Sequence, residues 1–384
     1  MNKVRIGVIG MGIMGAGHAG WLSSGRVKRC ELTAVHDVDP ERCACQPQVK
    51  CFKSSADLIR SGDVDAVVIA TPHYSHTDIG IDALEHGLHV MVEKPVSVHK
   101  ADCERMIAAH TNSKLVFAAM FNQRTDPYYQ KIRGLVSGGE LGEIRRINWV
   151  ITSWFRTGAY YRSGAWRATW AGEGGGVLLN QCPHNLDLYQ WMFGMPDRVR
   201  AFCKFGRYHD IEVEDDVTAY FEHPNGATGV IITSTGEAPG TNRLEVAGER
   251  GRLVLENDVI SFMRNEIEMS EFSRISSQGF DRPQAWDIRI PVSGHGGQHV
   301  EMLQNFVDAS LDGAPLIAPA SEGARSIELA NAILLSTFDD KTIELPMDGK
   351  AYEIKLKDKI SASTRAKKTG PALESGTLSK SFNK

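Results

Sequence analysis

The sequence predicts an α/β chain in two parts: an amino-terminal doubly wound parallel sheet, then an α+β domain with a large open, mostly antiparallel sheet. Three observations predict this architecture. A glycine-rich turn follows the first apolar segment, apolar and helical segments then alternate to about residue 120, and many short strand-like segments fill the later half. We place the first domain at residues 1–124, the second at 125–350 and a basic tail at 351–384.

The chain opens on an apolar run, Val4 to Ile9, that is typical of a buried parallel strand. The pattern Gly-x-Gly-x-x-Gly follows it directly. Its first glycine permits a tight turn, its second lets the backbone approach a pyrophosphate, and its third, Gly15, lets the next helix pack on the strand. That helix offers free N–H groups to phosphate. The expected phosphate contacts are Gly10, Gly12, Ile13 and Met14.

An acidic residue follows the second predicted strand, residues 31–35, where a dinucleotide ribose would bind. Asp37 lies about 20 residues beyond the third glycine. Its carboxylate would accept from ribose hydroxyls and repel a 2′-phosphate, which favours NAD over NADP, although Arg42 nearby weakens that preference. The alternative is a glycine turn that binds nothing, and the order of strand, glycines, helix, strand and acid argues against it.

Further strands and helices alternate after Asp37. Strands are predicted at 63–70, 89–93 and 115–120, and helices at 77–85 and 99–110. Ligands in such sheets bind beyond the carboxyl ends of the strands. The residues at these ends are expected to converge on one crevice with the glycine turn and to contact the cofactor: Thr71, Pro72, Glu93, Lys94 and Asn122. Arg42, His73 and His76 are further expected cofactor contacts.

The second part of the chain reads as a β-rich domain. A helix at 127–136 precedes strands at 144–152, 199–205, 217–222, 229–235, 243–246, 252–255 and 259–263, and helices at 299–311 and 321–338 close the domain. Antiparallel order is expected because no helices intervene between most of these strands. One face of such a sheet needs a cover, so we expect a homo-oligomer.

The tail differs in composition from both domains. From residue 355 onward it carries many lysines and few large apolar side chains. A solvated tail is the simpler interpretation, and an arm that docks on a neighbouring subunit is the other.

The overall composition excludes several classes of protein. A net charge of −4 argues against a nucleic-acid partner, and no apolar run is long enough to span a bilayer. The amino terminus lacks a signal-peptide pattern, so we expect a cytoplasmic protein. The seven cysteines are expected as free thiols, and the spacing of Cys43, Cys45 and Cys51 does not favour a metal site.

The tripeptide Glu93-Lys94-Pro95 is the second informative motif. Proline holds the preceding lysine in an extended conformation at a strand end, which directs the ammonium toward the crevice. A lysine there can bond a substrate hydroxyl and stabilise a developing alkoxide. A surface lysine beside a turn is the alternative.

The third motif is the stretch from Gly174 to Asp187. Asn180, His184 and Asp187 would share one face if this stretch were helical. Histidine suits proton transfer near neutral pH, although a structural histidine is the alternative. Pro183 fits a helix only near its start, so the beginning of this helix is open.

Other polar and aromatic residues are expected to line the pocket. Aromatic faces pack on sugar C–H groups, and arginine and asparagine bond hydroxyls. The expected substrate contacts are Lys94, Arg124, Tyr160, Trp166, Arg167, Asn180 and His184. His73 and His76 follow Thr71-Pro72 near the expected nicotinamide position, where a helix-start histidine without a chemical role is the alternative.

Together these motifs resemble the glucose–fructose oxidoreductase, inositol dehydrogenase and MocA family, from about Val4 to about Pro346. The resemblance implies a Rossmann domain, a second domain with an open sheet, and dimers or tetramers formed through that sheet. It implies oxidation or reduction of a sugar or polyol hydroxyl with a nicotinamide cofactor. Lys94 would be the catalytic lysine and His184 the proton-transferring histidine.

One residue departs from the pattern of many dehydrogenases that this chain resembles. They carry aspartate four residues before the histidine, whereas this chain has Asn180, which cannot take a proton. We expect an NAD-dependent dehydrogenase of a secondary hydroxyl on a sugar, sugar derivative or cyclitol. An NAD-retaining glycosidase that acts by transient oxidation, and a non-catalytic NAD- and sugar-binding regulator, stay open as alternatives.

Overall fold

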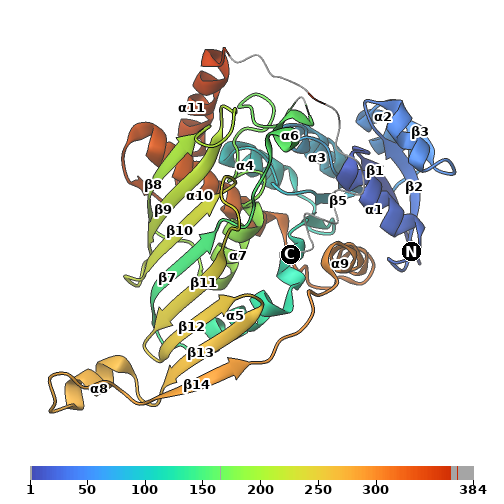
Figure 1. Ribbon diagram of the computed structural model, residues 1–384. Coiled ribbons are helices and arrows are strands. Elements are labelled where there is room, and N and C mark those ends of the chain that lie inside the picture. The colour runs from blue at the N-terminus through green and yellow to red at the C-terminus, as the bar shows by residue number, and fades with distance from the viewer. Residues whose placement is uncertain (1, 165, 365–369, 371–384) are drawn as a thin grey trace.

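A six-stranded parallel sheet forms the amino-terminal half of the protein. The structure is a computed structural model that describes residues 2–164, 166–364 and 370 (Figure 1). The sheet has the order β3-β2-β1-β4-β5-β6. All strands are parallel, and β1 to β3 extend the sheet to one side whereas β4 to β6 extend it to the other, so the strand order reverses between β1 and β4. The strands are β1 (Val4–Ile9), β2 (Cys30–His36), β3 (Lys50–Phe52), β4 (Ala66–Ile69), β5 (His89–Val92) and β6 (Phe117–Ala119). The Rossmann prediction is confirmed.

Helices cover both faces of this sheet. They are α1 (Ile13–Ser23), α2 (Ser55–Ile59), α3 (Ser75–Glu85) and α4 (Lys100–Ala109), with 3-10 turns η1 (Pro40–Cys45) and η2 (Asn122–Thr125). The sequence analysis did not anticipate β3 and α2, which have only three and five residues. Such short elements carry too few positions for a periodic pattern to stand out.

A nine-stranded sheet of order β14-β13-β12-β11-β7-β10-β9-β8-β15 forms the second half. Its strands are β7 (Ile144–Ile151), β8 (Arg198–Phe205), β9 (Glu214–Glu222), β10 (Thr228–Ser234), β11 (Asn242–Gly248), β12 (Gly251–Glu256), β13 (Val259–Asn265), β14 (Ala285–Ile290) and β15 (Ile343–Glu344). The sheet is mostly antiparallel, as expected, but β7 and β10 pair in parallel. The long connection between these two strands includes a helix, which permits a parallel crossover.

Three helices cover one face of the large sheet: α5 (Pro127–Ser137), α7 (Pro183–Phe193) and α10 (Ala320–Asp339) (Figure 1). The remaining helices are α6 (Gly158–Arg162), α8 (Met269–Ile275), α9 (Gln298–Asp312) and α11 (Gly349–Ala362). The opposite face carries exposed apolar side chains, among them Phe202 at 58% and Tyr220 at 39% exposure. In the described part of the chain, no helix combines the length and apolar character that a membrane crossing requires.

Segments from the carboxyl-terminal half pack back on the Rossmann sheet. Helix α9 contacts β1 and η2, and α10 contacts β6 and α4. The backbone N–H of Ala119 in β6 donates to the carbonyl of Ala318 at 3.0 Å. The side chain of Asp312, at the end of α9, bonds Arg29 before β2. These contacts fix the two sheets relative to one another, and the junction at which polar residues of the two halves meet is termed the cleft.

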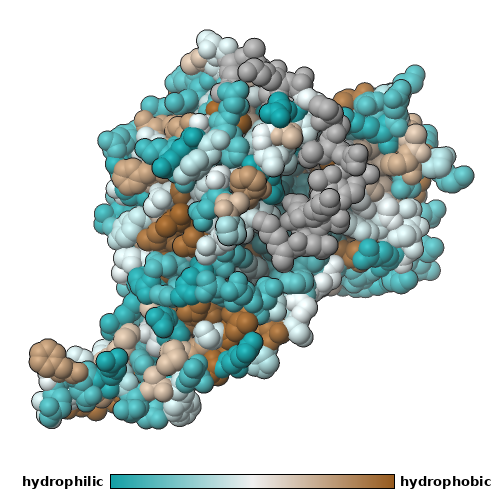
Figure 2. All heavy atoms as spheres, viewed as in Figure 1, coloured by the Kyte–Doolittle hydropathy of each residue, from teal (hydrophilic) through white to brown (hydrophobic). Residues whose placement is uncertain are grey.

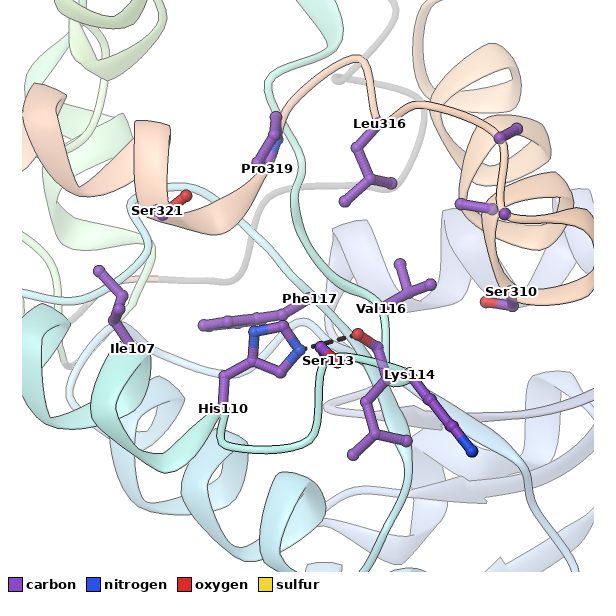
Figure 3. Close-up of a pocket in the computed structure, with 14 residues that line it drawn as sticks. Ile107, His110, Ser113, Lys114, Val116, Phe117, Ser310, Leu316, Pro319 and Ser321 are labelled. Carbon is purple, nitrogen blue, oxygen red and sulfur yellow. Dashed lines mark hydrogen bonds between the residues drawn. The ribbon is translucent and has the colours of Figure 1, made fainter.

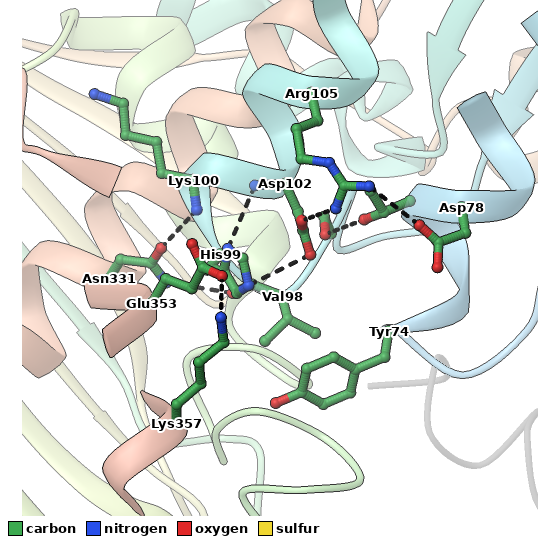
Figure 4. A network of polar contacts seen from close by, with 12 residues as sticks. Tyr74, Asp78, Val98, His99, Lys100, Asp102, Arg105, Asn331, Glu353 and Lys357 are labelled. Atoms are coloured by element: carbon green, nitrogen blue, oxygen red, sulfur yellow. Dashed lines mark hydrogen bonds and ion pairs between the residues drawn. The ribbon is translucent and has the colours of Figure 1, made fainter. Parts of the chain in front are cut away.

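Helix α11 corrects the prediction of a solvated tail from residue 351. It packs on α4 and α10 and buries Tyr352 and Leu356, which lie four residues apart on one helix face. Figure 4 shows its side chains Glu353 and Lys357 beside His99 and Asp102 of the α4 start. Because the segment contains many lysines, its overall composition is polar even though one narrow helix face is apolar. Except for Gly370, residues from 365 onward lie outside the described part of the chain, and so does most of the predicted docking arm.

Candidate functional site

The glycine turn between β1 and α1 has the geometry that a pyrophosphate requires. Gly10 has a φ of +92°, and a Cβ there would lie 2.7 Å from the backbone of Ala70. A Cβ on Gly15 would lie 1.7 Å from the Gly10 carbonyl oxygen, so α1 packs closely on the turn. At Gly12, the N-cap of α1, a Cβ would meet no atom of the described chain within 4 Å. The open space thus lies at the second glycine, beside free helix N–H groups, and fits a phosphate.

Asp37 lies directly beside this turn. Its carboxylate accepts hydrogen bonds from the backbone N–H of Met11 at 2.6 Å and of Asp39 at 2.9 Å, so its position is fixed. The Arg42 guanidinium lies 3.7 Å from the carboxylate and also faces Asp39 at 3.4 Å, with its side chain 55% exposed. The arginine therefore reduces the negative potential that Asp37 presents without displacing the carboxylate from the turn.

Glu93 and Lys94 occupy the end of β5. Glu93 Oε1 lies 2.7 Å from Nε2 of the buried His18, and its Oε2 accepts from the Lys94 backbone N–H at 3.0 Å. Burial alone would raise the pKa of Glu93, but the hydrogen bond to His18 and the nearby positive charges hold that pKa at about 2. Glu93 is thus an anion directly behind the backbone of Lys94, and its predicted contact with the cofactor stays a prediction.

The Lys94 side chain crosses the cleft between the two halves of the protein. Its ammonium Nζ is partly buried and donates to the main-chain carbonyl of Asn180 at 2.8 Å. Burial lowers the pKa of Lys94, and the negative charge of Glu93 opposes that effect. An ammonium has three donors, so others are left for a substrate oxygen.

The segment after β4 contributes two histidines with different surroundings. The buried His76 has its two ring nitrogens 2.9 Å from the carbonyl oxygens of Thr71 and Pro95. It therefore packs between the ends of β4 and β5, and its predicted contact with the cofactor stays a prediction. His73 faces the other half of the protein, with Nδ1 3.1 Å from the Glu173 carbonyl and its ring against Trp166.

His184 lies in the first turn of α7, directly after Pro183, which occupies the helix start as its chemistry requires. Its imidazole is buried, packs edge-on against Phe121, and its Nδ1 has no hydrogen-bond partner among the described residues. Burial and then the charge of Lys94 lower the pKa of His184 well below its usual value. The ring is thus neutral near pH 7 and close enough to Lys94 to feel its charge.

The stretch from Gly174 to Asp187 is helical only from Pro183, and Arg124 lies in an internal ion pair. Asn180 precedes α7, so it does not share a helix face with His184 and Asp187. Arg124, expected to contact substrate, is buried and donates to both Asp187 oxygens at 2.7 Å, as well as to the carbonyl of Ile317 and to Glu322. A buried carboxylate is stable only beside a compensating positive charge, and the Arg124 guanidinium supplies it to Asp187.

The aromatic loop before the glycine run meets Asn180 at the cleft. Tyr160 donates its hydroxyl hydrogen to Asn180 Oδ1 at 3.2 Å and accepts from Arg167 at 2.8 Å and Gln181 at 3.0 Å. The Arg167 guanidinium lies 4.6 Å from the ring centres of both Tyr160 and Trp166. The structure thus brings four of the predicted substrate contacts together: Tyr160, Trp166, Arg167 and Asn180.

The sequence analysis missed one acidic residue in this loop, Glu173. It is 2% exposed, its Oε1 accepts from the side-chain amide of Asn180, and its Oε2 accepts from the Ala168 N–H at 2.6 Å. Position 180 carries an asparagine instead of an acid, but the carboxyl group of Glu173 is hydrogen-bonded directly to that asparagine. A signal for it exists, because Glu173 is the single charge within the run from Gly172 to Gly176.

Unsatisfied polar atoms gather at the carboxyl edge of the Rossmann sheet. Asn122 donates from Nδ2 to Gln298 at 2.7 Å, but its Oδ1 and the Thr71 hydroxyl are buried without a partner among the described residues. Buried polar groups are rarely left unpaired. Together with His184 Nδ1, these atoms are available to pair with the polar groups of a nicotinamide nucleotide.

A cavity of about 520 Å³ lies elsewhere, at the amino end of β6, between the ends of α4 and α9 (Figure 3). Lys114 and His110 line it, and the His110 Nε2 lies 2.8 Å from the Leu115 carbonyl. None of the predicted site residues lines this cavity, which faces the opposite edge from Lys94. Within the described residues, no three His, Cys, Asp or Glu side chains are grouped to hold a metal ion.

Two family models match the chain, one for each half. Residues 4–121 match the oxidoreductase family with an NAD-binding Rossmann fold, and residues 129–254 match the GFO/IDH/MocA C-terminal domain.

Curated relatives align over nearly their whole length. The chain is 30% identical to inositol 2-dehydrogenase 2 of Paenarthrobacter aurescens over 88% of this chain and 97% of that protein. It is 25% identical to the myo-inositol 2-dehydrogenase of Thermotoga maritima over 89% of this chain and 98% of the relative.

Solved structures show the same architecture. The WlbA dehydrogenase of Chromobacterium violaceum, crystallised with NADH and UDP-GlcNAcA, is 26% identical with a TM-score of 0.78 over 91% of this chain and 97% of the other. The WlbA dehydrogenase of Bordetella pertussis, crystallised with the same two molecules, is 25% identical with a TM-score of 0.76 over 90% and 100% of the two chains.

Proposed function

Because this chain belongs to the GFO/IDH/MocA oxidoreductase family, with an NAD-binding Rossmann fold, we propose that it is a dehydrogenase of a secondary hydroxyl on a sugar, sugar derivative or cyclitol. The observation that carries the proposal is the contact of Lys94 Nζ with the Asn180 carbonyl at 2.8 Å, beside the neutral His184. That contact puts a cation and a base from opposite halves of the protein at one cleft.

The proposed chemistry divides the work between these two side chains. The Lys94 ammonium donates a hydrogen bond to the substrate oxygen and stabilises the charge that develops there. The His184 imidazole, neutral because it is buried, accepts the hydroxyl proton during oxidation and returns it during reduction. A nicotinamide, when bound, exchanges a hydride with the substrate carbon. Tyr160, Arg167 and Asn180 orient the sugar through its other hydroxyls.

The cofactor in this proposal is NAD, with NADP the weaker alternative. The residues that would hold it are Gly10, Gly12, Ile13, Met14, Asp37, Arg42, Thr71, Pro72, His73, Lys94 and Asn122. Asp37, fixed to the turn by the Met11 N–H, would accept from ribose hydroxyls and repel a 2′-phosphate. The partly neutralising Arg42 makes the expected preference moderate.

The proposal also includes a homo-oligomer formed through the large sheet. Exposed apolar side chains such as Phe202 and Tyr220 lie on the sheet face that α5, α7 and α10 leave open, and Figure 2 shows apolar patches over this face. A patch of this kind on a sheet favours association of identical faces.

The decisive experiment is a panel of cyclitols, free sugars, sugar acids and a nucleotide-linked sugar acid, with absorbance of NADH as the readout. We expect NADH to form with at least one polyol or sugar, and NAD to support a higher kcat/KM than NADP. Hydrolysis of an aryl glycoside without net NADH would contradict the proposal in favour of a glycosidase. Binding of NAD and sugar without turnover across the panel would contradict it in favour of a regulator.

A further inference from the structure

Glu173 is a buried acidic residue at the cleft to which the proposed chemistry assigns no role. It lies in the segment between α6 and α7 and is held at three points. Its two carboxylate oxygens accept from the Asn180 side-chain amide and the Ala168 N–H, and its main-chain carbonyl lies 3.1 Å from His73 Nδ1. Both of its side-chain oxygens therefore have hydrogen-bond partners, as buried polar atoms usually do.

The first consequence concerns the orientation of the Asn180 amide. A carboxylate accepts hydrogen bonds and cannot donate them, so the Asn180 NH₂ group must face Glu173. The amide oxygen then faces the other way and accepts from Tyr160. The Asn180 main-chain carbonyl accepts from Lys94. Glu173 thus holds the side-chain amide of Asn180, the same residue whose main-chain carbonyl accepts from Lys94.

The second consequence is electrostatic. Lys94 is surrounded by charges of both signs: Glu93 and Glu173 favour its ammonium, whereas burial, Arg167 and Arg156 oppose it. The other titratable groups that feel Lys94 are His73, His76, His184 and His299. All four histidines have lowered pKa values and are neutral near pH 7, so they do not compensate for loss of an acid.

We propose that Glu173 is a positioning residue for Lys94: acting through Asn180, it supplies the negative charge and the fixed geometry that keep the lysine an ammonium aimed at the substrate oxygen. The proposal rests on the dehydrogenase function given above. It also accounts for the asparagine at position 180, since the carboxylate that this position lacks stands directly behind it.

The first test compares Glu173→Gln with Glu212→Gln. Glu212 also accepts from a backbone N–H of this loop, that of Trp170 at 2.7 Å, but is not among the main charges that act on Lys94. For Glu173→Gln we expect kcat to fall about tenfold or more with KM changed less than about threefold, and the loss of activity at high pH to begin about one pH unit lower. Glu212→Gln should leave the pH profile unchanged.

The second test moves the charge instead of removing it. Asn180→Asp alone puts two carboxylates within hydrogen-bond distance, so one must take up a proton or separate, and we expect lower activity. The double variant Glu173→Gln with Asn180→Asp restores one carboxylate and one amide. We expect the double variant to regain most of the kcat lost in either single variant. The pH at which activity declines on the alkaline side should return to at least its value in the original protein. If the pH of the alkaline decline in activity is the same in all of these variants, Glu173 has only a structural role and the proposal is overturned.

A third measurement does not depend on finding the substrate. The pH dependence of Lys94 methylation by formaldehyde and borohydride, followed by mass spectrometry of its peptide, reports the charge state of the amine in the intact protein. Glu173→Gln should shift half-reaction to lower pH, with circular dichroism and NAD affinity close to those of the original protein. An unshifted reaction overturns the role of Glu173 even if the enzyme turns over. A shifted reaction in a protein that oxidises no substrate instead overturns the dehydrogenase function on which the role depends.

Discussion

Lys94 depends on its neighbours at the scale of single residues. Burial disfavours its charge, Glu93 behind its backbone and Glu173 beyond Asn180 restore it, and the carbonyl of Asn180 fixes where the ammonium lies. Lys94 in turn lowers the pKa of His184. The proposed chemistry requires a charged lysine and a neutral imidazole: the two acids favour the charge on Lys94, while burial and the charge of Lys94 disfavour a proton on His184.

Replacement of Lys94 by methionine keeps the length of the side chain but removes its charge and its donors. We expect kcat to fall about 10²–10³-fold or more, because stabilisation of the developing alkoxide is lost. NAD affinity, measured by fluorescence titration, should change less than about threefold, as the phosphates bind at the glycine turn. Lys114→Met, at the exposed lysine of the separate cavity, is the control and should keep its full rate. Retention of most activity in Lys94→Met would refute its assignment.

His184 gives a prediction about pH. Its pKa is lowered by burial and by Lys94, so the neutral form that accepts a proton persists below the usual histidine value. The kcat/KM for oxidation should therefore be flat from pH 7 down past 6.5 and decline only at lower pH. His184→Ala should reduce kcat about 10²–10⁴-fold and abolish this acid limb. A limb centred at or above pH 6.5 that His184→Ala leaves in place would assign the proton transfer to another group.

At the scale of elements, the turn between β1 and α1 separates packing from binding. Gly15 allows α1 to lie against the Gly10 carbonyl, whereas Gly12 faces open space. Both glycines belong to the same short motif, and a sequence pattern alone gives them the same weight. Their roles differ because one faces protein and the other faces the position of a ligand.

Two alanine variants test this difference. Gly15→Ala forces α1 away from the turn, and we expect a loss of about 1–3 kcal/mol in the free energy of unfolding together with weaker NAD binding. Gly12→Ala meets no protein atom and should cost less than about 1 kcal/mol of stability, yet its methyl group should weaken NAD binding about tenfold or more. Thermal unfolding and NAD titration measure both effects. Tight NAD binding by Gly12→Ala would mean that the phosphates do not approach this turn.

At the scale of the whole molecule, the two halves meet at one cleft because α9 and α10 return to the Rossmann sheet. The large sheet buries one face against its own helices and leaves apolar side chains exposed on the other (Figure 2). Association with a second copy of the chain would bury the apolar side chains on this open face.

We expect the protein to form a dimer or tetramer that sedimentation velocity detects at micromolar concentration. The double variant Phe202→Asp with Tyr220→Asp introduces charge into that face and should shift the species toward monomer with little change in circular dichroism. Ile354→Glu, at an exposed position of α11, is the control and should keep the original sedimentation coefficient. An oligomer unaffected by the double variant would exclude this face as the interface.

The sequence by itself determined the parallel sheet, the glycine turn, the strand ends that carry Asp37 and Lys94, and the open antiparallel sheet. Each is encoded within a few consecutive residues, where apolar periodicity, glycine and proline restrict the backbone directly. Local patterns of this kind can be interpreted without information about the rest of the chain. Tyr160, Arg167 and Asn180, predicted as substrate contacts, are hydrogen-bonded to one another, and their role toward a substrate stays a prediction.

Only the tertiary structure decided which polar groups serve the cleft and which serve the fold. Arg124 pairs with Asp187, 63 residues away, and Glu173 stands behind Asn180, while α11 buries a stripe hidden among lysines. Burial and long-range pairing set the cost of each charge, and neither can be read from neighbours in sequence. The same physics makes Arg124 structural, keeps His184 neutral and leaves Lys94 as the cation that faces the cleft.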